Sequence, residues 1–103
     1  MTIKLSNEAK QAACDTLPLY MTESLFLYFE QGYRPGSFLE AVLANDLAGA
    51  VSFADDTNKK YLEAYVQWLY WHPPGRPQGG WGSREAVDKW VEEANEARRA
   101  EMA

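Results

Sequence analysis

Apolar residues recur along most of this chain at spacings of three and four, the period of helices that pack on one side. The pattern predicts a first helix over Asn7–Asp15, capped by Ser6, and a second helix over Pro18–Gln31. Gly32 is placed to end the second helix in a left-handed conformation. No segment shows the strict alternation, bounded by hairpin turns, that half-buried strands require. The predicted fold class is therefore all-α.

The middle of the chain predicts two short helices with a break between them. Ser37 and Glu40 have the spacing of a capping box and are expected to open the first of the two. Continuing that helix would place the charge of Asp46 inside its apolar arc, so a break at Asn45-Asp46 is expected. One of these two side chains would then cap the next helix. That helix has an apolar set at helical spacing, comprising Leu47, Ala50, Val51 and Ala54.

The segment Lys59–Trp71 is apolar around most of its circumference, and Asp55-Asp56-Thr57 precede it as its cap. One face, expected to pack on the core, comprises Leu62, Tyr65, Val66 and Leu69. A neighbouring face comprises Tyr61, Ala64, Trp68 and Trp71. A surface helix hides only one apolar stripe, so either this is the central helix of the bundle or a partner covers its second face.

The aromatic helix is expected to end at a Pro/Gly-rich loop, HPPGRPQGGWG (72–82), since such a sequence cannot continue a helix. Ser83 is predicted to cap the last helix, whose apolar arc comprises Val87, Trp90, Val91, Ala94 and Ala97. Residues 98–103 lose the pattern and are expected to fray. These features predict a compact bundle of about five short helices, with the Pro/Gly-rich loop before the last one, in a single domain over 1–103.

Composition and charge narrow the class of partner. The 103 residues are 47% hydrophobic and 24% charged, as in a globular protein, and fifteen acidic against ten basic residues give a net charge of −5. Because a basic footprint is absent, direct nucleic-acid binding is not expected. No apolar run reaches the length of a membrane span, and the first residues lack the apolar centre of a signal peptide. A cytoplasmic location is therefore expected, and the single cysteine fits a reducing compartment.

Candidate catalytic residues are few. A thiol–imidazole pair of Cys14 and His72 is less favoured than a small buried cysteine and a histidine at a helix end. A zinc site would need three or four Cys, His or carboxylate ligands, and the sequence has only two of the stronger type, Cys14 and His72. Asp46, Asp55 and Asp56 would suit Mg²⁺ or acid–base chemistry, but each also fits a helix cap or first turn, which we favour. No metal, no cofactor and no enzymatic activity are expected, and a metal-dependent or acid–base enzyme using these aspartates is the alternative.

Large aromatic residues gather beside the Pro/Gly-rich loop: Trp68, Tyr70, Trp71 and Trp81. In one interpretation Trp81 folds back onto the aromatic helix and covers the loop. In the other, these rings form a partner-binding patch with Arg76 as an anchor, since Trp, Tyr and Arg dominate interface hot spots. A second candidate surface is the acidic face of the last helix, comprising Glu85, Asp88, Glu92 and Glu96.

Several short motifs occur together between Pro35 and Trp90: PGSFL (35–39), AVL (41–43), NDL (45–47), Ala54-Asp55, Asn58, WGS (81–83), Val87 and Trp90. In combination they resemble a family of short, largely uncharacterised proteins of tailed phages and prophages. The resemblance implies a phage or prophage accessory protein in the host cytoplasm that binds a host or phage protein. By analogy it suggests an inhibitor of a host defence complex, of the anti-CRISPR kind. A structural homo-oligomeric component, with a homodimer as its simplest form, is the remaining alternative.

Overall fold

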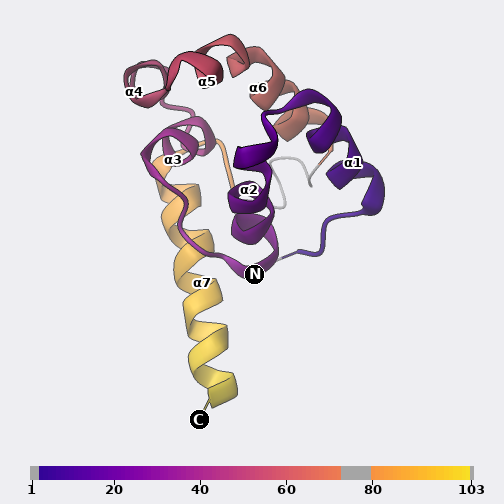
Figure 1. Ribbon diagram of the computed structural model, residues 1–103. Coiled ribbons are helices and arrows are strands. Elements are labelled where there is room, and N and C mark those ends of the chain that lie inside the picture. Colours follow the sequence, from indigo (N-terminus) through magenta and orange to yellow (C-terminus); the bar gives the residue numbers. More distant parts are fainter. Residues whose placement is uncertain (1–2, 73–79, 103) are drawn as a thin grey trace.

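The computed structural model describes residues 3–72 and 80–102, and this part of the chain is helical without strands (Figure 1). The prediction of an all-α fold is confirmed. The prediction of about five helices is wrong, because the described residues form seven: α1 (Asn7–Thr16), α2 (Leu19–Gln31), α3 (Ser37–Leu43), α4 (Leu47–Phe53), α5 (Asp56–Lys60), α6 (Leu62–Trp71) and α7 (Arg84–Met102). The predicted Pro/Gly-rich loop falls mainly on residues 73–79, which lie outside the described residues.

Two breaks divide the middle of the chain, and only the first was expected from the sequence. The expected break is present, since Asn45 has a positive φ of 60° and Asp46 begins α4 by accepting a hydrogen bond from the Gly49 N–H at 3.0 Å. The second break, at Tyr61, divides the aromatic segment into α5 and α6. There the Tyr61 N–H donates to the Asn58 carbonyl at 3.0 Å, three residues back, where an α-helix would use the residue four back.

The core is arranged around α2, which Figure 1 shows in the middle of the helical cluster. On α2, Leu25, Tyr28 and Phe29 are buried. The Phe29 ring lies 5.9 Å from the ring of Trp68 in α6 and 6.0 Å from that of Trp90 in α7. The central helix is thus α2, and the aromatic helix α6 packs against it from one side.

Local details of three helices differ from the sequence prediction. The capping box of Ser37 and Glu40 is wrong: Gly36 is the N-cap of α3, and the Glu40 carboxylate binds Arg34 and Arg84, each at 2.6 Å. The helix expected from the apolar set that begins at Leu47 is present as α4, but Ala50 is its one buried residue. In α7 the predicted arc is buried at all positions except Ala97, which is exposed.

The chain returns to the core at Gly80. The Tyr28 hydroxyl donates to the Gly80 carbonyl, and the Gly82 N–H donates to the Leu43 carbonyl at 2.7 Å. Gly80 has a φ of 92°, and a Cβ there would lie 3.1 Å from the Trp90 ring, so both backbone and space favour glycine. Ser83 then caps α7 as predicted, accepting from the Ala86 N–H at 3.0 Å.

The final helix extends away from the other helices toward the C-terminus (Figure 1). It is helical through Met102, although the sequence loses its apolar pattern from Arg98 onward. The expected fraying of residues 98–103 stays a prediction.

Candidate functional site

The structure divides the predicted partner-binding residues into two groups. Trp68 and Trp81 are buried, with 2% and 6% of their surface exposed, and the Trp68 indole N–H donates to the Ala9 carbonyl at 2.8 Å. Tyr70 and Trp71 are exposed by 62% and 74%. Arg76 lies outside the described residues. Of the four predicted rings, two belong to the core and two remain available to a partner.

The exposed rings continue an apolar line along α6. Val66 lies one helical turn before Tyr70 and is 53% exposed, and the rings of Tyr70 and Trp71 meet edge to face at 5.3 Å. We call Val66, Tyr70 and Trp71 the α6 ridge. The prediction that Val66 packs on the core is wrong, because the helix turns Trp68 inward beside Tyr65 and Leu69.

A shallow groove meets the ridge at Val66 and lies between α6 and the α3–α4 pair. We call it the α4–α6 groove; it has a volume of about 60 Å³ and its aliphatic walls comprise Ala41, Val42, Leu47, Ala50, Leu62 and Val66. Asn45 and Asp46 also line it. Leu47, the first residue of α4, is 73% exposed. The groove therefore offers apolar contact area that is open to solvent.

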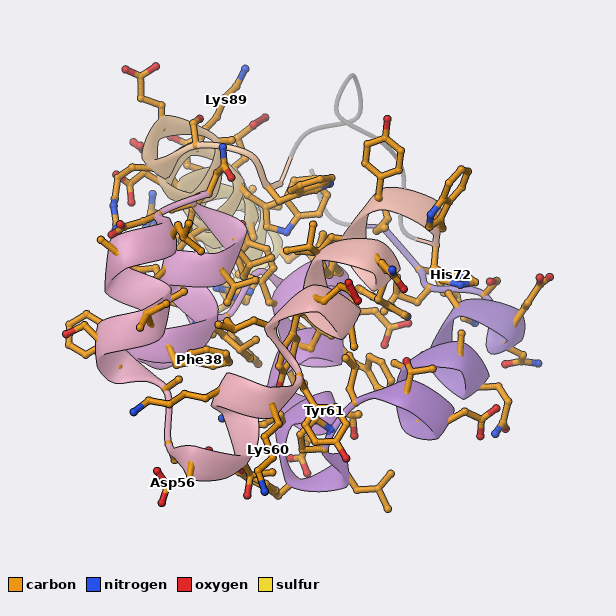
Figure 2. The ribbon with its side chains drawn as sticks, turned by 90° about the horizontal axis from the view of Figure 1, so that it is seen from above. Phe38, Asp56, Lys60, Tyr61, His72 and Lys89 are labelled. Carbon is orange, nitrogen blue, oxygen red and sulfur yellow. The ribbon has the colours of Figure 1, made fainter. Side chains whose placement is uncertain are left out.

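A second pocket, of about 230 Å³, lies between α6 and α1. Ala12 and Thr16 of α1 form one wall, and Trp71 and His72 stand on the other. Figure 2 shows His72 at the end of α6 on the side where α1 lies, and its ring is 6.5 Å from that of Trp68. The prediction of a small buried cysteine is wrong, since Cys14 is exposed on α1.

Two of the three aspartates of the alternative site are helix caps. Asp46 and Asp55 cap α4 and α5 as predicted, and Asp55 accepts from the Asn58 N–H at 2.7 Å. The Tyr20 hydroxyl also donates to Asp55 at 2.6 Å, and this bond, followed by the backbone bond from Asn58, lowers the pKa of the Asp55 carboxyl. Figure 2 shows Asp56 pointing away from the body of the molecule. Within residues 3–72 and 80–102, no three Cys, His, Asp or Glu side chains gather as metal ligands would.

The acidic face of α7 lies on the surface, where Glu85, Asp88, Glu92 and Glu96 are all exposed. Asp88 accepts from Arg34 at 3.0 Å, so one of the four carboxylates is part of an ion-pair network. The same network joins Arg84 to Glu40 at 2.6 Å and to Asp46 at 3.5 Å. It ties the start of α7 to α3 and to the cap of α4.

Sequence reasoning missed the groove and its residues Leu47 and Val66. One signal was present: the seven residues of α4, LAGAVSF, contain no charged side chain, although most of this short helix faces solvent. A surface helix without charge is unusual unless another surface covers it.

Comparison with known proteins finds no match among protein-family models, curated proteins or solved structures. In the part of the chain described by the structure, no helix is long and apolar enough to span a bilayer.

Proposed function

We propose that this chain is a non-enzymatic phage or prophage accessory protein that acts by binding a host or phage protein through the α6 ridge. The observation that carries the proposal is the exposure of Val66, Tyr70 and Trp71 together on the outer side of α6. Monomeric proteins rarely leave such patches bare without a use for them. Tyrosine and tryptophan are also among the residues that contribute most to protein interfaces.

The roles of the titratable residues support binding over catalysis. The carboxylates of Asp46 and Asp55 accept backbone N–H groups as helix caps. Arg34 and Arg84 form ion pairs with carboxylates of neighbouring elements. The kind of partner rests on the family resemblance of the PGSFL, NDL and WGS motifs. In its most specific form, the proposal is an inhibitor that occupies a surface of a host defence complex, as anti-CRISPR proteins do.

A second candidate function is that of a homo-oligomeric structural component. It is favoured by α4, which exposes Leu47, Val51 and Phe53 by 73%, 46% and 60%. A second copy would bury this surface in an interface repeated on both subunits. Light scattering separates the two candidates, because a homodimer doubles the chain mass of 11.7 kDa and its fraction rises with concentration.

The test of the main proposal is capture of partners from a host lysate by the tagged chain and by a Tyr70→Ala/Trp71→Ala variant. We expect the variant to lose about thirtyfold or more in affinity for the captured protein, since truncated hot-spot residues cost about 2 kcal/mol or more. Its free energy of unfolding should change by no more than about 1 kcal/mol, as for surface positions. Leu19→Ala, at a 68% exposed site on α2, is the matched control.

Two further variants make the result decisive. Trp68→Ala and Trp81→Ala should each lower the free energy of unfolding by about 3–5 kcal/mol, because these rings are buried. If the Tyr70→Ala/Trp71→Ala variant binds like the wild type and a Glu85→Gln/Glu92→Gln/Glu96→Gln variant does not, the binding surface is the acidic face of α7 and the ridge proposal is wrong.

A further inference from the structure

The α4–α6 groove adjoins the ridge directly, because Val66 belongs to both. Its apolar lining also includes Ala41 and Val42 of α3, Leu47 and Ala50 of α4, and Leu62 of α6. A volume of about 60 Å³ fits one or two aliphatic side-chain ends and is too small for a separate ligand of drug size. A surface that docks on the ridge would therefore place side chains in this groove.

The shape and lining of the groove select one mode of peptide recognition. Added strands need an exposed sheet edge, and the described residues contain no strand. Polyproline segments dock between aromatic rings, whereas the walls here are aliphatic. A groove between two helices instead receives the side-chain ridge of a third helix. An amphipathic helix with aliphatic anchors is the occupant that fits.

The charged residues around the groove indicate which charge the polar face of that helix carries. The three helices that line the groove, α3, α4 and α6, carry Glu40 and Glu63 and no lysine or arginine. Asp46 stands at the rim, where Arg84 approaches it at 3.5 Å while binding Glu40 more closely at 2.6 Å. The nearest lysines along the chain, Lys59 and Lys60, belong to α5, before the break at Tyr61. With a net charge of −5 over the whole chain, the complementary helix is basic.

We propose that the α4–α6 groove binds a basic amphipathic helix of the partner protein. One or two of its aliphatic side chains enter between Leu47 and Val66, and its lysines or arginines lie near Asp46 and Glu63. This inference rests on the proposed function, since it takes a protein partner as given, and it adds the kind of segment which that partner presents.

Three synthetic peptides of about 18 residues, long enough to hold a helix, provide the probe. They share one leucine face and carry lysine, glutamine or glutamate on the polar face. Titration into the full chain, followed by amide chemical shifts, should give affinities in the order lysine, glutamine, glutamate. The shifts should concentrate at Leu47, Ala50 and Val66, and added salt should weaken the lysine peptide most.

Variants locate the binding. Leu47→Gln and Val66→Gln should each weaken the lysine peptide about tenfold, equivalent to about 1.4 kcal/mol. Leu19→Gln is the matched control, because Leu19 and Leu47 are both the first residue of a helix and similarly exposed, at 68% and 73%. Glu63→Gln should reduce the preference for lysine over glutamate peptides. Thermal melting of each variant shows that the fold is kept.

Equal affinities of the lysine and glutamate peptides, shifts away from α4 and α6, or equal weakening by Leu19→Gln would each overturn the inference. Its failure is distinct from failure of the proposed function. If Leu47→Gln and Val66→Gln still capture the natural partner while Tyr70→Ala/Trp71→Ala does not, the ridge binds and the groove does not. If none of these variants affects capture, both are wrong.

Discussion

The side chain of Asp46 holds two elements together. Its Oδ1 accepts from the Gly49 N–H at 3.0 Å and begins α4, while Oδ2 faces Arg84 at the start of α7. Asn45 makes this possible by taking the left-handed conformation with φ 60°, which asparagine tolerates better than most residues. The chain can thereby leave α3 and start α4 with only three residues between the two helices.

Replacing Asp46 with alanine should lower the free energy of unfolding by about 1–2 kcal/mol, the usual cost of losing an N-cap. Asp46→Asn should cost less, since an amide oxygen can still accept from Gly49. Asp56→Ala, at an exposed first-turn position of α5, is the control and should change stability by less than about 0.5 kcal/mol. Urea unfolding measures all three, and equal losses for Asp46→Ala and Asp56→Ala would show that the cap contributes nothing.

A second single-residue effect concerns pH. The hydrogen bond from Tyr20, and then the backbone bond from Asn58, hold the pKa of Asp55 below its ordinary value. A carboxyl whose folded pKa is depressed stabilises the fold above its unfolded pKa, near 3.9, and that contribution is lost as pH falls through the folded value. Tyr20→Phe removes the largest cause of the shift.

The Tyr20→Phe variant should therefore be less stable than the wild type at pH 7, and the difference should shrink as pH falls below about 4. Urea midpoints measured from pH 7 to the acid limb test this. A difference that stays constant with pH would mean that Tyr20 acts by packing and not through the carboxylate of Asp55.

Among the elements, the pair α5 and α6 depends on one buried polar contact. Asn58, only 3% exposed, accepts at Oδ1 from the Tyr65 hydroxyl at 2.7 Å, and this bond spans the break at Tyr61. Burial raises the pKa of Tyr65, so the hydroxyl stays protonated and able to donate. The contact holds the turn between the two helices.

Tyr65→Phe should lower the free energy of unfolding by about 1–3 kcal/mol, because it leaves the buried amide oxygen of Asn58 without its donor. Tyr70→Phe makes the same chemical change five residues later, at a site 62% exposed, and should have an effect within about 0.5 kcal/mol. Chemical unfolding compares the two. Equal effects would mean that the Asn58 oxygen finds another donor when Tyr65 loses its hydroxyl.

Helix starts could be predicted from the sequence where their cause is local. Ser6, Asp46, Asp55 and Ser83 each bond a backbone N–H three residues ahead, so a short window contains the whole interaction. The capping box of Glu40 failed because Arg34 and Arg84, brought close by the fold, bind its carboxylate. The rotation of α6 likewise depends on Trp68 reaching Ala9, 59 residues away.

The residues of the candidate site also divide into those that a local pattern reveals and those that only the fold brings together. Tyr70 and Trp71 could be proposed from composition alone, because a surplus of large rings is visible in the sequence. The sequence could not show that Tyr70 and Trp71 are exposed while Trp68 and Trp81 are buried, because this depends on which side of α6 meets α2. The α4–α6 groove needs residues of α3, α4 and α6 to be placed in space, and no local pattern joins Val42, Leu47 and Val66.

At the scale of the whole molecule, the fold combines a compact body with one extended helix. The radius of gyration of 13.2 Å is close to the value of about 13 Å for a compact chain of 100 residues. The extents of 44 × 29 × 25 Å nevertheless show one long axis, and Figure 1 shows α7 reaching away from the other helices toward the C-terminus. The anchored half of α7 includes Val87, Trp90, Val91 and Ala94, all buried.

Beyond Ala94, the contacts of α7 with the rest of the chain involve Arg98. Its guanidinium lies 4.7 Å from the centre of the Tyr33 ring and donates to the carbonyl of Gln31. Past this point, among the residues that the structure describes, no hydrogen bond or ion pair joins the helix to another element. Isolated helices shorter than about 12–15 residues are marginal in water. The end of α7 should therefore open far more readily than its anchored half.

Hydrogen exchange tests this directly. Amides of residues 99–102 should exchange close to the unprotected rate, whereas those of Val91 and Ala94 should be among the slowest in the chain. Arg98→Ala should extend fast exchange back toward Asn95 while changing the free energy of unfolding by less than about 1 kcal/mol. Uniform protection through Met102 would contradict the prediction. Protection that appears only as the protein concentration rises would mean that a second copy covers the end of α7, in favour of the homo-oligomeric candidate.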